Sequence, residues 1–263
     1  MMVWQRKGKL LKVSLILTTY NCKRNLIRTL ESIDRQDYTD IEIIIKDGGS
    51  TDGTLDVIQS FADKHSNVIW MSGADNGIYD AMNQGYAMSS GDVIAFFNDL
   101  FIGNDVISKY IQAIENGGEN CFGVHSDLVY ATDTKVIRYW RMGKGKISSG
   151  WMPGHPTLYL RREVYQQYGL YDTSYKCSAD FEFMVRILKD NQIELAYIPE
   201  VLIRMFYGGT STGSVGSYGT SIKEAYGALK KNGVRFAWWI IFLRILRTLT
   251  QFVHSKIEVS ELQ

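Results

Sequence analysis

The first residues whose types and spacing suggest chemistry are Asp47, Gly48 and Gly49, which follow the strand-like segment 40–46. A carboxylate at the end of a buried strand can accept hydrogen bonds from a base N–H or a ribose hydroxyl. The two glycines remove side chains that would block a nucleotide. The ordinary alternative is a turn followed by a helix cap, which we prefer for Ser50 and Asp52. Asp47 is therefore the candidate for contact with a nucleotide base.

A second carboxylate, Asp180, opens an expected helix at 180–189 after a polar loop. There it could take the proton of an acceptor hydroxyl during a single in-line displacement, which inverts the reacting carbon. The alternative is a first-turn acid favoured by the helix dipole, and the residues alone support that alternative. Glu182, two positions on, points elsewhere on the helix and is a reserve candidate.

The elements that must position these residues alternate between strands and helices. Apolar, β-branched runs predict strands at 13–17, 40–46, 68–71 and 93–97, and helical spacing predicts helices at 26–33, 54–61 and 79–88. This order predicts an α/β fold with a Rossmann-like, doubly wound, mostly parallel sheet. Ligands then bind at the carboxyl ends of the strands, directly after Leu17, Lys46, Met71 and Phe97.

The second half of the chain is less regular. We expect a helix at 105–115, strands at 122–130, 135–140 and 194–198, and further helices at 162–168 and 180–189. A mixed region of this kind is typical of the part of an enzyme that binds an acceptor substrate. The loop 207–219, rich in glycine, serine and threonine, either closes as a lid over a phosphate through residues such as Ser211 or serves as a linker, and we favour the lid.

Composition excludes several classes of protein. The 263 residues carry 29 lysines and arginines against 28 acids, so no net positive field attracts nucleic acid. Cys22, Cys121 and Cys177 fit neither a disulfide framework nor a metal motif, which indicates a reducing compartment. No signal-like apolar run precedes Val13, so we expect a cytoplasmic location.

The segment 234–253 is apolar and aromatic but is interrupted by Arg235, Arg244 and Arg247. These charges argue against a membrane-spanning helix. An amphipathic helix lying at the membrane surface, with tryptophans at headgroup depth, is favoured over a helix packed on its own domain. We therefore expect the protein to be peripheral at the inner face of the cytoplasmic membrane.

Several motifs in one order carry a family resemblance. The chain resembles family 2 glycosyltransferases of the GT-A fold over residues 12–210, in particular bacterial O-antigen and exopolysaccharide (colanic-acid-type) transferases. The matching stretches are Thr18-Thr19-Tyr20-Asn21, Asp47 to Thr54, Ala74 to Gly85, Ser90 to Asp99, His155-Pro156-Thr157 and Ala179 to Phe183.

The resemblance implies the roles of individual residues. It places the base at Asp47, and ribose and a divalent metal, Mg²⁺ or Mn²⁺, on the diphosphate at Asn98 and Asp99, with Asp99 as the metal ligand. It makes Asp180 the catalytic base, which reverses the preference from the residues alone. It gives His155 a place in the acceptor or diphosphate pocket, and an ordinary structural histidine is an equal alternative. The donor-binding set is Thr18, Tyr20, Asn21, Asp47, Gly48, Asp75, Asn98 and Asp99.

Two positions depart from the family pattern. Relatives usually show two or three acids after the fourth strand, whereas here Asp99 stands without a second carboxylate before Asp105. Asp99 could suffice with phosphate oxygens and waters, or the enzyme could be impaired or independent of metal. Many relatives also have an arginine for the diphosphate at the position of Met82.

The expected organisation has three parts: a basic segment at 1–12, a GT-A domain at 12–210 with a nucleotide-sugar half (12–104) and an acceptor half (105–210), and a flexible loop with membrane-associating helices at 211–263. The expected function is inverting transfer of a hexose, with UDP-sugar as the default donor, to a hydroxyl of a lipid-linked glycan in bacterial surface polysaccharide synthesis. The alternatives are a nucleotide-sugar-binding scaffold subunit and a sugar-phosphate nucleotidyltransferase. The latter needs a glycine-rich loop after the first strand, and 18–22 contains no glycine.

Overall fold

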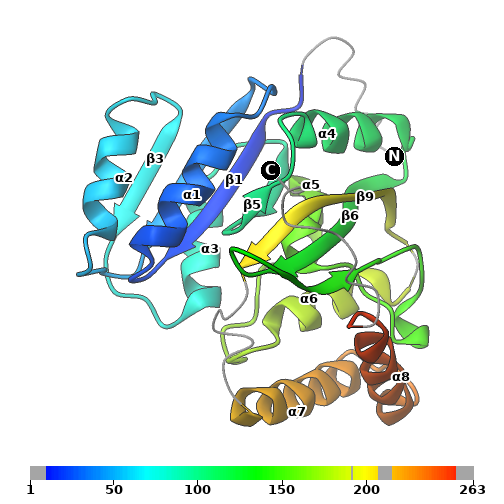
Figure 1. The fold of residues 1–263 in the computed structure, drawn as a ribbon. Coiled ribbons are helices and arrows are strands. Elements are labelled where there is room, and N and C mark those ends of the chain that lie inside the picture. The colour runs from blue at the N-terminus through cyan, green and yellow to red at the C-terminus, as the bar shows by residue number, and fades with distance from the viewer. Residues whose placement is uncertain (1–9, 191, 207–214, 253–263) are drawn as a thin grey trace.

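The computed structural model describes residues 10–190, 192–206 and 215–252 (Figure 1). One sheet runs through the molecule. Its strands lie in the order β3 (Val68–Ser72), β2 (Ile41–Asp47), β1 (Val13–Thr19), β4 (Val93–Phe96), β8 (Tyr159–Arg161), β6 (Cys121–Ala131), β9 (Glu194–Phe206) and β5 (Leu100–Phe101), with β7 (Val136–Trp140) beside β6.

The strands β1–β4 form the parallel half of the sheet, as predicted. Five further strands complete it: β8, β5 and β7 run antiparallel to their neighbours, while β6 and β9 pair in parallel.

Helices cover both faces of this sheet because its central strands are apolar on both sides. Alternate residues of β1 enter different cores: Leu15 and Leu17 pack on one face, and Ile16 packs on the other. The first core is covered by α1 (Lys23–Asp34), α2 (Thr54–Ala62) and α4 (Val106–Asn116). The second lies under α3 (Ile78–Met88), α5 (Arg162–Tyr168), α6 (Ala179–Leu188), α7 (Val215–Lys231) and α8 (Ala237–Thr250).

A buried carboxylate fixes the amino ends of the parallel strands. Glu42 on β2 accepts hydrogen bonds from the Ser14 hydroxyl of β1 (2.6 Å) and the Ser90 hydroxyl before β4 (2.7 Å). Its Oε2 also pairs with Lys12 Nζ at 2.5 Å. Burial raises the pKa of Glu42, but these partners outweigh burial and lower it to about 2. Glu42 therefore fixes the register of the strands at their amino ends, whereas the ligand is expected at their carboxyl ends.

The strand expected at 194–198 extends to Phe206. Pro199 and Glu200 lie where the pairing of β9 with β6 shifts register, and pairing resumes at Val201 with Asp127. A bulge tolerates the missing N–H of proline, so the proline interrupts the pattern without ending the strand.

The glycine-rich segment 207–219 is not a loop throughout, because α7 begins at residue 215. Ala225, Ala228 and Leu229 of α7 are completely buried, and this packing outweighs the poor helix propensity of glycine and serine near its start. Residues 207–214, including Ser211, lie outside the described part of the chain.

The C-terminal helix α8 packs on the domain through Ala237, Ile240 and Ile241 and leaves Trp238 and Trp239 exposed. It lies beside α7 at one end of the molecule (Figure 1). The buried face fits the alternative of a helix packed on its own domain, whereas association with a membrane stays a prediction. Within the described residues, no helix combines the length and apolarity needed to cross a membrane.

Candidate active site

The carboxyl end of β1 is tied to the end of β4. Asn98 accepts a hydrogen bond from the Thr18 N–H through Oδ1 (3.1 Å) and donates to the Thr18 hydroxyl through Nδ2 (3.0 Å). Tyr20 is exposed, whereas Asn21 adopts a left-handed conformation (φ 46°) and accepts from the Thr51 N–H. Three of these four predicted residues therefore hold loops together, and Tyr20 is open to a ligand.

Asp47 is fully buried, and both of its carboxylate oxygens are engaged by the protein. Oδ1 accepts from the hydroxyls of Thr19 (3.0 Å) and Ser50 (2.5 Å). Oδ2 accepts from the N–H groups of Gly49 and Ser50 and from the Ser72 hydroxyl. Burial raises the pKa of Asp47, but these hydrogen bonds dominate and lower it. With five protein donors, Asp47 has the surroundings of a structural anchor.

Lys46, which the sequence reasoning missed, is a buried cation at this edge. Its Nζ donates to the carbonyl oxygens of Asp47 (2.6 Å) and Gly73 (2.7 Å) and lies 3.6 Å from Asp75 Oδ2. The available signal was a charged residue within an otherwise apolar strand. Lys46 is only 1% exposed, so its ammonium group has little freedom to move. It therefore holds the Asp75 carboxylate beside the end of β2.

Gly48 lies against the side chains of two other predicted residues. A Cβ added at Gly48 would come within 2.9 Å of Asp75 Oδ2 and 3.3 Å of Tyr20 Cδ2. Asp75 also accepts from the Gly77 N–H, which orients its carboxylate. Gly48, Asp75 and Tyr20 thus form one small surface at the carboxyl ends of β1, β2 and β3.

Asp99 is a buried carboxylate, and among the described residues its one hydrogen-bond donor is the Phe206 N–H at 3.3 Å. Burial raises its pKa to about 7. The described residues contain no group of three or more histidines, cysteines and acids that could hold a metal. A lone, poorly compensated carboxylate nevertheless fits as one protein ligand of Mg²⁺ or Mn²⁺, because these ions commonly take further oxygens from phosphate and water.

Asp180 begins α6 and meets α3 across the site. The Tyr79 hydroxyl donates to Asp180 Oδ1 at 3.0 Å, and no described residue donates to Oδ2. Asp180 is half-buried. One carboxylate oxygen is thus held in place, and the other accepts no hydrogen bond within the described part of the chain.

His155 and Glu182 have different surroundings. His155 Nε2 lies 2.8 Å from the Tyr171 hydroxyl, its ring stacks on Phe96, and burial lowers its pKa. Glu182 is 1% exposed and is bound by Arg186 (2.9 Å) and by Asn232 (3.0 Å). Glu182 therefore packs away from Asp180, as its position on the helix predicted, and stabilises α6.

Comparison with known proteins identifies the family. Residues 14–185 match the family model described as glycosyl transferase family 2. The chain belongs to glycosyl transferase family 2. It is 29% identical over 209 residues to a PGL/p-HBAD biosynthesis glycosyltransferase of Mycobacterium bovis, covering 75% of this chain and 78% of the relative. It is 30% identical over 185 residues to an uncharacterised glycosyltransferase of Mycobacterium tuberculosis, covering 66% and 68%.

Solved structures confirm the fold of this glycosyltransferase. S. aureus TarS 1–349 in complex with UDP-GlcNAc superposes with a TM-score of 0.70 at 15% identity, covering 91% of this chain and 73% of that one. The Pyrobaculum calidifontis mannosyltransferase PcManGT in complex with GDP-Man and Mn²⁺ gives 0.60 at 14% identity, covering 95% and 77%. The predicted GT-A fold and family are confirmed.

We expect Gly48→Ala to weaken nucleotide binding, because the new methyl group displaces Asp75 or Tyr20. The expected loss is about tenfold, which corresponds to about 1.4 kcal/mol. The measurement is calorimetry with UDP, GDP and dTDP. Gly73→Ala is the matched control, because a Cβ there meets nothing within 4 Å. Equal affinities in the two variants would remove this surface from the binding site.

Proposed function

We propose that this glycosyltransferase inverts the anomeric centre as it moves a hexose from a nucleotide diphosphate-sugar, with UDP as the default nucleotide, to an acceptor hydroxyl. The observation that carries the proposal is the Asp180 carboxylate, oriented by Tyr79 with one oxygen left for a proton. The site lies at the edge of the sheet where parallel α/β folds bind ligands. Residues 12–104 would bind the donor, and 105–210 would supply the base.

The reaction needs one displacement. The acceptor oxygen attacks the anomeric carbon while its proton passes to Asp180 Oδ2, and the bond from that carbon to the diphosphate oxygen breaks with its electron pair. Attack opposite the leaving group inverts the carbon. The hydrogen bond from Tyr79 fixes the carboxylate in the plane that the proton must enter.

Asp180→Asn should lower kcat by roughly 10²- to 10⁴-fold, because an amide cannot accept the proton. Affinity for the nucleoside diphosphate should remain unchanged, since the substitution removes only a transition-state role. Steady-state kinetics and calorimetry measure the two effects. Asp190→Asn, just beyond the other end of α6 and exposed, is the matched control. Normal turnover in Asp180→Asn would exclude it as the base, and nucleotide binding without turnover in the wild type would favour a scaffold subunit.

The geometry supports a revised division of the donor-binding residues. We assign contact with the nucleoside to Tyr20 and Asp75, which flank Gly48. Asp47, Asn98, Thr18 and Asn21 would instead shape the loops, because their polar groups are already bonded within the protein. This assignment moves the base-reading carboxylate from Asp47 to Asp75.

A divalent metal would be held by Asp99 together with diphosphate oxygens. When bound, such an ion stabilises negative charge on the leaving group. The part of the chain that the structure describes gives this buried carboxylate one hydrogen bond, which leaves its charge poorly satisfied by those residues.

We expect transfer to require Mn²⁺ or Mg²⁺ and to fall to background in EDTA. Asp99→Asn should raise the concentration of Mn²⁺ needed for half-maximal activity by about tenfold, within the range seen when metal-site groups are removed. A titration of activity with Mn²⁺ measures both effects. Full activity of the wild type in EDTA would rule out the metal assignment.

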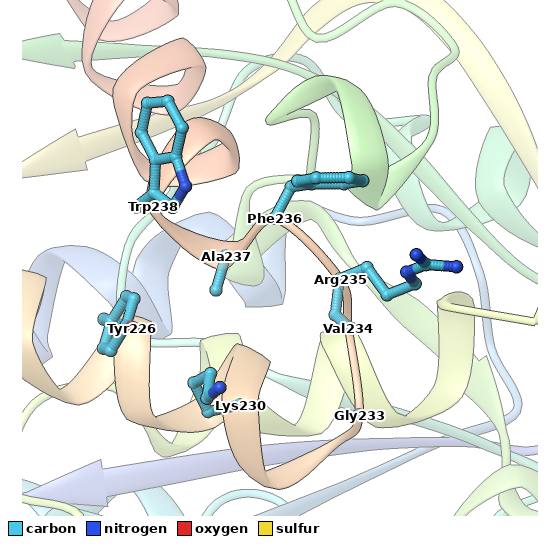
Figure 2. Close-up of a pocket in the computed structure, with 8 residues that line it drawn as sticks. All are labelled: Tyr226, Lys230, Gly233, Val234, Arg235, Phe236, Ala237 and Trp238. Atoms are coloured by element: carbon cyan, nitrogen blue, oxygen red, sulfur yellow. The ribbon is translucent and has the colours of Figure 1, made fainter.

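The acceptor would be a lipid-linked glycan reached at the membrane surface, with the protein peripheral at the cytoplasmic face. Exposed aromatic side chains gather on α8, including Trp238 (65% exposed) and Trp239 (44%). A pocket of about 330 Å³ at the junction of α7 and α8 combines Lys230 and Arg235 with the aromatic rings of Tyr226, Phe236 and Trp238 (Figure 2). Cations beside interfacial aromatics suit a surface of anionic phospholipid.

Replacing both Trp238 and Trp239 by alanine should reduce sedimentation with vesicles of phosphatidylglycerol and phosphatidylcholine by about tenfold, because buried aromatic area drives insertion. Trp70→Ala on the edge strand β3 is the matched control, since Trp70 is also partly exposed. Wild-type protein that stays in solution with anionic vesicles at low salt would contradict the membrane assignment.

A further inference from the structure

Arg244 is a cation of α8 that points inward, away from the exposed tryptophans. Its guanidinium carbon lies 4.2 Å from the ring centroid of Phe181, the residue after Asp180. Within the described residues, no carboxylate lies within 4.0 Å of its nitrogens. Burial lowers the pKa of Arg244, and the nearby charge of Asp180 opposes this effect only in part.

Arg138 on β7 is a second cation of this kind. Its guanidinium lies over the rings of Tyr130 (4.6 Å) and Trp140 (5.1 Å), and its Nε donates to Gln251 Oε1 at 2.5 Å. It too has no acidic partner among the residues that the structure describes. Burial lowers its pKa as well.

Strand pairing and ring contacts show where the two arginines lie relative to the site. Tyr130 on β6 pairs in register with Arg138, and the next residue of β6 pairs with Phe206, whose N–H donates to Asp99. Arg138 thus lies on the side of the candidate metal ligand, and Arg244, which contacts the start of α6, lies on the side of the candidate base. The diphosphate must leave from this region in the proposed reaction.

Contacts at the end of the domain fix α8 in this position. A Cβ at Gly150 would lie 2.7 Å from the backbone nitrogen of Arg244, so only glycine permits the close approach of the two backbone segments. Arg247 donates to the Ser149 carbonyl (3.0 Å), and the Tyr139 N–H donates to the Gln251 carbonyl (3.0 Å). Arg244 is thus held by the packing of its helix rather than by an ion pair of its own.

Two half-buried cations that have no acidic partner among the described residues are stabilised when an anion joins them. We propose that Arg138 and Arg244 bind the diphosphate of the donor and stabilise it as it leaves. This inference rests on the proposed function. Guanidinium groups bind phosphate oxygens through paired N–H donors.

The test is calorimetry with Arg244→Met and Arg138→Met, using whichever of UDP, GDP and dTDP binds the wild type most tightly, together with its free nucleoside. We expect affinity for the nucleoside diphosphate to fall about ten- to a hundredfold, while affinity for the nucleoside stays unchanged. The melting temperature should stay equal or rise, because a half-buried charge with no acidic partner in the described part of the chain is removed. A purely structural role would lower it.

Arg247→Met on the same helix is the matched control, and Arg244→Lys retains the charge if Arg244→Met does not fold. Unchanged diphosphate affinity in both methionine variants would overturn the inference and leave the proposed function intact. A rise only in the KM for the acceptor would assign the cations to the acceptor and also overturn it. A wild-type protein that binds no nucleoside diphosphate would instead contradict the proposed function itself.

Discussion

The carboxylate of Asp47 holds together the loops on which the candidate site depends. Its donors come from the last residue of β1, from the loop after β2 and from the last residue of β3. The parallel pairing of the strands sets Thr19, Asp47 and Ser72 side by side, and the Asp47 carboxylate ties the side chains of the other two residues together. A single buried anion with five donors makes the arrangement cooperative, since losing any one donor leaves a charged oxygen undersatisfied. Glu42 performs the equivalent task at the amino ends of the strands.

Sequence patterns predicted the parallel half of the fold because hydrophobic burial specifies it almost alone. The runs at Val13–Thr19 and Ile41–Asp47 are buried on both faces, and the helices between them show one apolar stripe. The second half was harder, because β9 continues past Pro199 only through a bulge that depends on its partner β6. A prediction from local pattern cannot anticipate a partner more than seventy residues away.

The candidate site shows the same division between local and long-range information. The sequence predicted that Asp47 and Asp75 lie at the carboxyl ends of their strands, where the structure has them, because the topology dictates where strand-end loops gather. It could not distinguish a carboxylate surrounded by protein donors from one facing a ligand. Lys46 reverses the usual expectation for lysine: it is buried, and its ammonium group joins two backbone carbonyls to Asp75. Only the register of β2 against β3 brings those groups together.

The electrostatic cost of placing two buried carboxylates side by side best explains why Asp99 follows β4 without a second acid next to it. Asp99 is desolvated enough for its pKa to approach 7, so a second carboxylate beside it would raise the cost of holding either in the charged form. A cation or the arginines supplied by β7 and α8 can lower that cost without another acid. The same helix α8 turns tryptophans outward and Arg244 inward. The proposed membrane surface and the proposed diphosphate contact therefore share one helix, and the position of each constrains the other.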